Sequence, residues 1–391
     1  KARAFVTGRK GVLNSIGKAL DGNSAPVVWL HSASLGEFEQ GRSVMEQIKQ
    51  RFPQEKIIVT FFSPSGYEIR KNTPLADYVF YLPADTAKDA RKFLDIIDPK
   101  FAVFTKYEYW YHYFNELNKR KIRLLMISAI FREDQVFFKQ YGGFFRSILK
   151  KVSYYFTQNT DSVNMLKWIG ISNAGLAGDT RFDRVVELPK QHQEISEAAR
   201  FSLNHETIVA GSTWPADEEL LKALLEKNKS LKAIIAPHEI HEEHIDSIKK
   251  LFPTALLFSK FSSYTDQQIA SSQVLVIDNI GMLSSLYHYG RMAYIGGGFG
   301  AGIHNTLEAA TYGMPVIFGP KYEKFQEAID LLELGAGFSV SSEKDLNEVY
   351  IALQNSEKLL KASTAAKNYV QQRSGATQII MKYLQTERLL D

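Results

Sequence analysis

Residues 295–320 read IGGGFGAGIHNTLEAATYGMPVIFGP, and this stretch decides the predicted fold. An apolar run of strand length, residues 292–295, leads into five glycines within seven positions. A segment of helical period, residues 307–312, and a second apolar run, residues 315–318, follow. A strand, a tight glycine turn, a helix and another strand form the repeating unit of a parallel sheet. The glycine loop has two interpretations: its backbone N–H groups cradle a phosphate where the helix begins, or it is a purely structural turn.

The alternation of strand and helix extends over the whole chain. Further strand-like runs occupy residues 27–30, 57–62, 101–104, 122–127, 208–210, 233–236 and 274–277, and helical stretches occupy residues 43–52, 88–97 and 218–226. This pattern predicts an α/β fold with two Rossmann-like, doubly wound domains. A polar stretch at residues 188–199 separates them, so we expect domains at residues 1–190 and 200–391, the second closed by a C-terminal helix from about residue 356. Ligands of such sheets bind beyond the carboxyl ends of the strands, which predicts a central cleft that the two domains face.

Composition excludes several classes of protein. Of the 391 residues, 45% are hydrophobic and 23% charged, as in globular proteins and unlike disordered or coiled-coil chains. The chain has no cysteine, which excludes disulfides, thiolate metal sites and cysteine nucleophiles. A net charge of +4 is too small to indicate nucleic-acid binding. The sequence has no P-loop, no G-x-S-x-G elbow and no Asp-x-Asp pair, so we expect neither a P-loop ATPase nor an α/β-hydrolase nor a metal-bridged diphosphate site.

Two segments bear on membrane contact, although no apolar run is long enough to span a bilayer. The first twenty residues carry five basic side chains and no acid: Lys1, Arg3, Arg9, Lys10 and Lys18. They suit a cytoplasmic juxtamembrane segment that follows a removed upstream piece, or an ordinary solvated terminus. Residues 131–151 interleave basic residues with the aromatic residues Phe137, Phe138, Tyr141, Phe144 and Phe145. That pattern suits a membrane interface or a phosphorylated lipid, and equally a buried aromatic stripe.

Three polar groups in the first half follow strand-like runs or approach the domain boundary. In HSASLGE, residues 31–37, a tight turn places Glu37 at the start of a helix, either as a proton acceptor or as a carboxylate that the helix dipole favours. KYEYW, residues 106–110, offers Glu108 beside aromatic residues. In GDTRFDR, residues 178–184, Arg181 stabilises a phosphate or carboxylate, or forms a charge pair with Asp179 or Asp183.

Two segments in the second half indicate a nucleotide site. Glu308, one turn into the helix after the glycine loop, is placed to reach ribose hydroxyls. The loop also matches the weak dinucleotide pattern G-x-G-x-x-A, but Phe318 stands where that pattern requires an acid. In APHEIHEEH, residues 236–244, helical geometry spreads the three histidines too widely for a metal. We therefore interpret His238 as a nucleotide contact, with a surface histidine as the alternative.

Together these segments resemble the Kdo transferases, inverting glycosyltransferases of the GT-B fold. HSASLGE and TFFSPSG (residues 60–66) are similar to the family's H-x-x-S-x-G-E and T-x-T-x-x-G motifs. KYEYW stands where the family has an E-T-E-L-W-type segment, and GDTRFD resembles its G-N-x-[KR]-F-D. GIHNTLEAATYGMPVIFGP resembles its G-G-H-N-x-L-E-x-A-x-x-G-x-P-V-x-F-G-P. The order and spacing of these motifs cover nearly the whole chain.

The resemblance implies the activity and the site. Family members move Kdo (3-deoxy-D-manno-oct-2-ulosonic acid) from CMP-Kdo to a phosphorylated lipid A precursor in lipopolysaccharide synthesis. They act without a metal or cofactor at the cytoplasmic face of the inner membrane, commonly behind an N-terminal anchor. The resemblance implies that the N-terminal domain binds the acceptor and the C-terminal domain the donor, with Glu37 as the general base and Glu108 and Arg181 as transition-state stabilisers. The implied CMP contacts are Pro237, His238, Ile280, Gly281, Met282, Asn305, Thr306, Leu307 and Glu308.

Departures from the family pattern keep rival interpretations open. Lys106 replaces the first acid of E-T-E, and His238 is followed by Glu239 where many members have Arg-His. Met282 follows Gly281 where a glutamate is usual, and an arginine that many members carry after Ile127 is missing. The rivals are a GT-B enzyme that uses a UDP-sugar, an epimerase on the same double fold, and a nucleotide-sugar-binding protein without catalysis.

Overall fold

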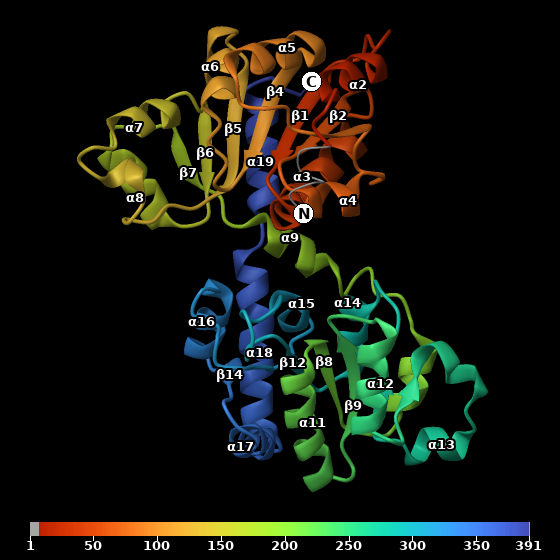
Figure 1. The fold of residues 1–391 in the computed structure, drawn as a ribbon. Coiled ribbons are helices and arrows are strands. Elements are labelled where there is room, and N and C mark those ends of the chain that lie inside the picture. Colours follow the sequence, from red (N-terminus) through yellow and green to blue (C-terminus); the bar gives the residue numbers. More distant parts are fainter. Residues whose placement is uncertain (1–7, 391) are drawn as a thin grey trace. The chain divides into compact units, whose positions relative to one another are not determined.

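The computed structural model describes residues 8–390, and these form two compact units (Figure 1). Among the described residues, the first unit comprises residues 8–184 and 373–390, and the second comprises Val185–Gln372. The boundary therefore falls within helix α9 (Thr180–Glu187), a few residues before the expected polar stretch. Each unit is an α/β domain built on one parallel sheet, so the predicted α/β class with two doubly wound domains is confirmed.

The first sheet has seven parallel strands in the order β3-β2-β1-β4-β5-β6-β7. Its strands are β1 (Val27–Ser32), β2 (Lys56–Phe61), β3 (Tyr78–Tyr81), β4 (Pro99–Thr105), β5 (Arg123–Ala129), β6 (Tyr154–Thr157) and β7 (Ala174–Leu176). The strand order reverses between β1 and β4. Open α/β sheets bind ligands at such a reversal, beyond the carboxyl ends of the strands.

The helices of the first unit cover both faces of this sheet. They are α2 (Val12–Ala19), α3 (Leu35–Arg51), α4 (Pro64–Arg70), α5 (Ala87–Ile97), α6 (Tyr111–Lys119), η1 (Val136–Phe138), α7 (Gly143–Leu149), α8 (Thr160–Trp168) and α19 (Ala376–Thr386). Alternate strand residues enter two cores: Val28 and Leu30 pack with α3 and α19, and Val27 and Trp29 pack with α5 and α6. Strands buried on both faces read as continuous apolar runs, which is why the sequence pattern located them.

The second sheet has seven parallel strands in the order β10-β11-β9-β8-β12-β13-β14. Its strands are β8 (Thr207–Thr213), β9 (Lys232–Pro237), β10 (Leu256–Leu257), β11 (Val274–Val276), β12 (Met292–Ile295), β13 (Val316–Phe318) and β14 (Gly337–Ser339). Its helices are α10 (Ser196–Ser202), α11 (Pro215–Lys227), α12 (Glu242–Leu251), η2 (Phe258–Ser263), α13 (Asp266–Ser271), α14 (Leu283–Leu286), η3 (Tyr287–Tyr289), α15 (Leu307–Ala310), α16 (Gln326–Glu333), α17 (Glu343–Leu353) and α18 (Ser356–Arg373). Here the strand order reverses between β8 and β12.

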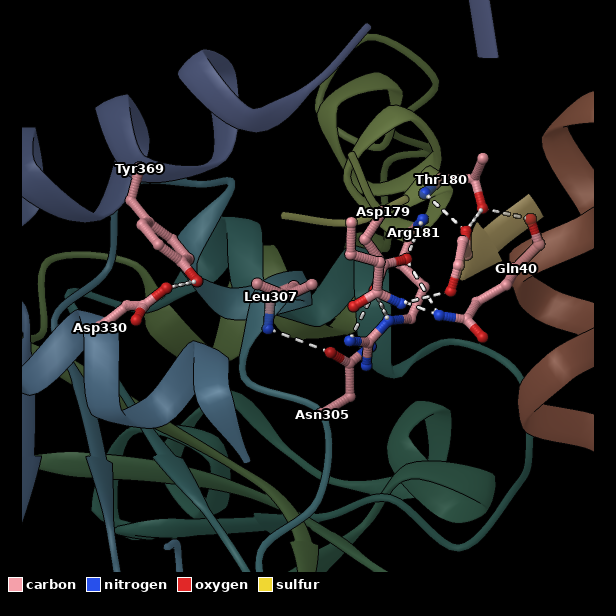
Figure 2. A network of polar contacts seen from close by, with 10 residues as sticks. Gln40, Asp179, Thr180, Arg181, Asn305, Leu307, Asp330 and Tyr369 are labelled. Atoms are coloured by element: carbon pink, nitrogen blue, oxygen red, sulfur yellow. Dashed lines mark hydrogen bonds and ion pairs between the residues drawn. The ribbon is translucent and has the colours of Figure 1, made fainter. Parts of the chain in front are cut away.

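The end of the chain departs from the expected domain boundary. The sequence predicts one closing helix for the second domain, but the structure divides this segment into α18 and α19. In the second unit, the Tyr369 hydroxyl of α18 donates to Asp330 of α16 at 2.9 Å (Figure 2). The chain then returns to the first unit, where α19 buries Ile380 and Leu384 beside α3. The expected assignment of all C-terminal residues to the second domain is thus corrected, because α19 has an apolar face that completes the core of the first.

Candidate active site

The first carboxylate of interest follows β1. Ser34 is the N-cap residue of α3, and its hydroxyl donates to the half-buried carboxylate of Glu37 in the first helical turn. A Cβ at Gly66 would lie 2.5 Å from the Phe61 ring and 3.0 Å from the backbone of Ser34. Only glycine therefore lets α4 approach this turn so closely, which gives the glycine of TFFSPSG a structural reason.

The second carboxylate follows β4, the strand next to β1. Oε2 of Glu108 accepts a hydrogen bond from Trp110 Nε1 at 2.8 Å and lies 3.4 Å from Nε2 of the buried His31. Trp110 Nε1 is also 3.2 Å from that histidine nitrogen. Glu37 and Glu108 thus both stand at the carboxyl ends of β1 and β4, where the first sheet reverses its strand order.

Tyr107 connects charged groups that the sequence reasoning treated separately. Burial raises the pKa of its phenol, and so does the nearby Glu37 carboxylate, while Arg132 and Arg181 oppose the rise. The Arg132 guanidinium carbon lies 5.7 Å from the centre of the Tyr107 ring. One carboxylate and two guanidinium groups therefore act on one phenol. The sequence analysis missed Tyr107 and Arg132, although Arg132 follows β5 closely and Tyr107 lies within a quoted motif.

Arg181 is held by a buried network (Figure 2). Its Nε and Nη2 contact Asp179 Oδ2 at 3.0 and 2.9 Å, and Gln40 Nε2 donates to both oxygens of the same carboxylate at 3.1 Å. Burial alone would raise the pKa of the Asp179 carboxyl, but Arg181 and these hydrogen bonds bring it below its usual value. The expected charge pair with Asp179 is therefore present. Asp183, the other expected partner, accepts hydrogen bonds from the backbone N–H groups of Gly375 and Thr377 at the start of α19.

Next to Asp179, Thr180 ties this segment to the core. The Thr180 hydroxyl donates to the carbonyl of Gln40 and lies 2.9 Å from the Ser128 hydroxyl. Because Thr180 has a single hydroxyl hydrogen, Ser128 is the donor in the second contact. These hydrogen bonds connect Thr180 to Gln40 of α3 and Ser128 of β5, and they thereby fix the backbone of the neighbouring Arg181.

Three non-glycine residues with left-handed backbones mark the carboxyl ends of strands in both units. They are Lys106 (φ 65°) after β4, Ser128 (φ 49°) in β5 and Ser212 (φ 55°) in β8. Such conformations are costly for residues with a Cβ and cluster at functional sites. Their position agrees with the edges that the strand-order reversals define.

The second unit carries a stack of three rings at its own reversal point. His238, which follows β9, lies between Trp214 and His304, with ring centres 4.9 and 4.3 Å away. Trp214 Nε1 donates to His304 Nε2 at 3.2 Å, so this nitrogen carries no proton. Burial, and then the neighbouring His238, lower the pKa of His304 to about 4. His304 is therefore neutral at physiological pH, while the exposed His238 faces solvent.

The packing of the glycine loop gives its glycines a structural reason. A Cβ on Gly296 would lie 2.2 Å from the Ser212 carbonyl oxygen, and one on Gly298 would lie 2.6 Å from the Gly319 Cα. Several of the loop's N–H groups donate within the protein: those of Gly296, Gly297, Gly300, Gly302, Ile303 and His304. Gly297, for example, donates to the buried Asp217 carboxylate at 2.9 Å. A phosphate cradle would therefore use the other N–H groups of the loop and of the helix start, and this interpretation stays a prediction.

The predicted nucleotide contacts differ in how far their side chains are exposed. Asn305 is exposed; its Oδ1 accepts from the Leu307 N–H at 3.0 Å (Figure 2), and its Nδ2 donates to Glu308 at 3.1 Å. Ile280 is 86% exposed, and Gly281 beside it has φ 102°, a conformation that suits glycine. The remaining predicted contacts have buried or half-buried side chains: Pro237, Met282, Thr306, Leu307 and Glu308.

The other histidines of APHEIHEEH do not converge on a metal position. His244 Nδ1 donates to the Glu239 carbonyl at 2.8 Å, and its Nε2 lies 3.1 Å from the buried Glu218 carboxylate. Across residues 8–390, the side chains of histidine, aspartate and glutamate form no group of three or more that could hold a metal ion.

The aromatic segment is partly core and partly surface. Phe137 and Phe138 are buried, whereas Tyr141 is 78% and Phe144 57% exposed. Of the basic residues near the start of the chain, Lys1 and Arg3 lie outside the described residues. Arg9 donates to the carbonyls of Leu82 and Phe62 and is therefore tied to the fold. None of the helices within residues 8–390 is long and apolar enough to cross a membrane.

Comparisons with solved structures identify the fold. The chain resembles a UDP-GlcNAc 2-epimerase from Neisseria meningitidis with a TM-score of 0.63 and 16% identity, covering 92% of this chain and 100% of the other. It resembles a MurG from Acinetobacter baumannii with a TM-score of 0.58 and 13% identity, covering 93% and 99%. These likenesses confirm the predicted GT-B-type fold.

Sequence comparisons point to one family. A family model described as 3-deoxy-D-manno-octulosonic-acid transferase (kdotransferase) matches residues 8–184. Curated relatives with that name occur in Rickettsia felis, at 28% identity over 92% of this chain and 78% of the relative, and in Aquifex aeolicus, at 28% identity over 83% and 85%. These comparisons agree with the resemblance to the Kdo transferases, a family of glycosyltransferases, that the motifs indicated.

Proposed function

We propose that this chain transfers Kdo from CMP-Kdo to a phosphorylated lipid A precursor, with inversion at the anomeric carbon. The match of residues 8–184 to the Kdo transferase family model, together with curated relatives of that name, supports Kdo as the transferred sugar. The observation that carries the mechanism is the half-buried Glu37, which Ser34 holds at the start of α3 where the first sheet reverses its strand order.

In the proposed reaction Glu37 is the general base. An acceptor hydroxyl gives its proton to the Glu37 carboxylate while its oxygen forms a bond to the anomeric carbon. The bond between that carbon and the phosphate oxygen breaks, and CMP leaves with the electron pair. A carboxylate placed for this transfer contributes about 10²–10⁴-fold to the rate.

Glu108 and Arg181 stabilise opposite charges in this proposal. The anomeric carbon becomes positive as the bond to CMP breaks, and a carboxylate such as Glu108 lowers the energy of that charge. Arg181 would bind an anionic group of the donor, its phosphate or its carboxylate. The Asp179 carboxylate supports this role because it holds the guanidinium through Nε and Nη2. We propose that no metal takes part, since the chain has no Asp-x-Asp pair.

The second unit is proposed to bind the CMP part of the donor. The ring stack of Trp214, His238 and His304, with Asn305 and Glu308 after it, supports this assignment. In the proposal, Glu308 binds ribose hydroxyls and the exposed His238 contacts the nucleotide. The other proposed CMP contacts are Pro237, Ile280, Gly281, Met282, Thr306 and Leu307.

We further propose that the first unit binds the acceptor at the cytoplasmic face of the inner membrane. The exposed aromatic residues Tyr141 and Phe144, together with Arg146 of α7 and the lysines Lys150 and Lys151 after it, support contact with an anionic lipid surface. The exposed Trp168 at the end of α8 adds to this aromatic surface because it stacks on Phe138.

The deciding experiment measures CMP release and Kdo transfer with CMP-Kdo generated in situ, with and without a lipid A precursor. We expect acceptor-dependent release by the wild type, a loss of about 10²–10⁴-fold in kcat for Glu37→Gln, and unchanged CMP binding. Glu46→Gln, on the same helix and with a side chain that is 42% exposed, is the matched control and should retain activity.

Two other outcomes would favour the rival functions. A folded wild type that binds CMP but releases none from the donor would favour a binding protein without catalysis. Thermal protection by UDP instead of CMP would favour a UDP-sugar enzyme, since a ligand stabilises only a fold that binds it.

A further inference from the structure

Beneath Glu108 lies a line of buried polar groups that the proposed mechanism does not use. Trp29 Nε1 is 2.8 Å from Thr60 Oγ1, and His31 Nδ1 is 2.9 Å from the same oxygen. On the other side of its ring, His31 Nε2 is 3.4 Å from Glu108 Oε2. The side chains of Trp29, Thr60 and His31 are fully buried. Water therefore does not complete their hydrogen bonds, and their protons can be counted.

The count starts at Thr60, whose hydroxyl has one hydrogen and two lone pairs. The indole N–H of Trp29 can only donate, so it occupies one lone pair. Within the described part of the chain, the other polar atom in hydrogen-bond distance of this oxygen is His31 Nδ1. If Nδ1 carried a proton it would donate as well, and the Thr60 hydrogen would have no acceptor. A buried donor without a partner is unfavourable, so Thr60 donates to an unprotonated Nδ1.

This assignment places the ring proton of a neutral His31 on Nε2. The Nε2–H group then points at Glu108 Oε2, the same oxygen that accepts the Trp110 indole N–H at 2.8 Å. Trp110 Nε1 also lies 3.2 Å from His31 Nε2, but its contact with Glu108 Oε2 is shorter at 2.8 Å, so we assign the indole proton to the carboxylate. Two N–H donors then converge on one carboxylate oxygen. The opposite tautomer would present a lone pair to the carboxylate and remove one of these two donors.

We propose that His31 is a positioning residue for Glu108. In this proposal the Thr60 hydroxyl selects the Nε2–H tautomer of His31, and this tautomer donates to the Glu108 carboxylate. The residues come from adjacent strands: His31 is in β1, Thr60 is opposite it in β2, and Glu108 follows β4. The rigid sheet therefore sets the orientation of a carboxylate that lies on a loop. The catalytic consequence rests on the proposed function, in which Glu108 stabilises positive charge at the anomeric carbon.

The tautomer is tested on the wild-type protein by long-range ¹H–¹⁵N NMR of ¹⁵N-histidine-labelled material. The chain has nine histidines, and His31→Gln identifies the signals of His31 by their loss. We expect a protonated Nε2 and an unprotonated Nδ1. A protonated Nδ1 in the wild type would overturn the proposal without any activity measurement.

The positioning role is tested with Thr60→Val, which keeps the shape of the side chain but removes the hydroxyl, and with Thr60→Ser, which restores it. We expect Thr60→Val to move the His31 proton toward Nδ1 and to lower kcat about 10- to 100-fold, with KM for the donor nearly unchanged. Thr60→Ser should recover both the tautomer and kcat. If Thr60→Val changed the tautomer of His31 but left kcat unchanged, the positioning role would be disproved. A wild type without transferase activity would sink the proposed function instead, and the NMR result would still stand.

Discussion

His304 illustrates how one residue in a motif acquires a property from its neighbours. Its ring accepts the Trp214 indole N–H through Nε2 and stacks on His238. Protonation of His304 would break the first contact and place a positive charge against the His238 ring. These contacts, together with burial, account for the lowered pKa of about 4.

This pKa predicts a pH-dependent stability of the second unit. An unfolded histidine has a pKa of about 6.5. Below pH 6.5 the unfolded chain therefore binds a proton at this position, whereas His304 in the folded chain stays unprotonated until the pH approaches 4. The contribution of neutral His304 to the free energy of unfolding is fully present above pH 6.5 and is lost as the pH falls toward 4. In urea unfolding at pH 7.5 and pH 5, we expect the wild type to lose about 1–2 kcal/mol more than His304→Gln, which keeps an acceptor for Trp214.

The matched control for this comparison is His205→Gln, at an exposed position of the same unit. It should show the pH dependence of the wild type. An identical slope for His304→Gln and the wild type would show that the ring stack does not keep His304 neutral.

At the scale of elements, α7 shows why the aromatic segment could not be placed from its sequence. The helix has seven residues and begins with Gly143 followed by two phenylalanines. Adjacent helical positions point about 100° apart, so a short helix on the edge of a domain cannot bury both side chains. Phe144 is left exposed, whereas Phe137 in η1 reaches the core.

If this surface contacts lipid, Tyr141→Ser and Phe144→Ser should weaken binding to anionic vesicles. Each buried aromatic side chain contributes about 1.5–3 kcal/mol when fully removed from water, so partial insertion predicts a loss of about 5- to 10-fold per substitution. Co-sedimentation with phosphatidylglycerol vesicles measures this loss. Ile351→Ser, at a similarly exposed apolar position of the second unit, should change nothing. Equal losses for all three variants would contradict a specific membrane surface.

At the scale of the whole molecule, the chain closes its first unit with its last helix. Asp183 accepts two backbone N–H groups at the start of α19, and Ser43 of α3 contacts Thr377 at 2.8 Å. Ile380 and Leu384 then complete the apolar core on that face of the sheet. The first unit therefore requires residues from both ends of the sequence.

A pair of neighbouring residues tests this closure. Ile380 is fully buried, so Ile380→Ala should cost about 2–5 kcal/mol of unfolding free energy in the first unit. Ile379 is 45% exposed, and Ile379→Ala should cost much less. Hydrogen exchange should show faster exchange within residues 8–184 of the first variant and little change in the second unit. Loss of protection chiefly in the second unit would contradict the assignment of α19.

Sequence pattern located the long central strands because they are buried on both faces and read as apolar runs. It missed β3, β6, β7, β10 and β14, which are short, so that few residues carry a pattern. All of these except β6 lie at sheet edges. Among candidate site residues, Glu37, Glu108 and Arg181 could be predicted because each lies in a motif of distinctive composition. Tyr107 and Arg132 were missed because their relation to Glu37 is one of space: neither sequence distance nor residue type indicates it.

The sequence by itself determined the α/β class, the two parallel sheets and the resemblance to the Kdo transferases, because strand–helix periodicity and motif order are local properties of the chain. Tertiary structure alone decided why the loop needs its glycines, since only packing shows that several of its N–H groups donate within the protein and that Gly298 lies against Gly319. It also decided that the last helix packs in the first unit, and which ring nitrogen of His31 carries the proton. Each of these depends on groups that are distant in sequence and meet only when the sheets have formed.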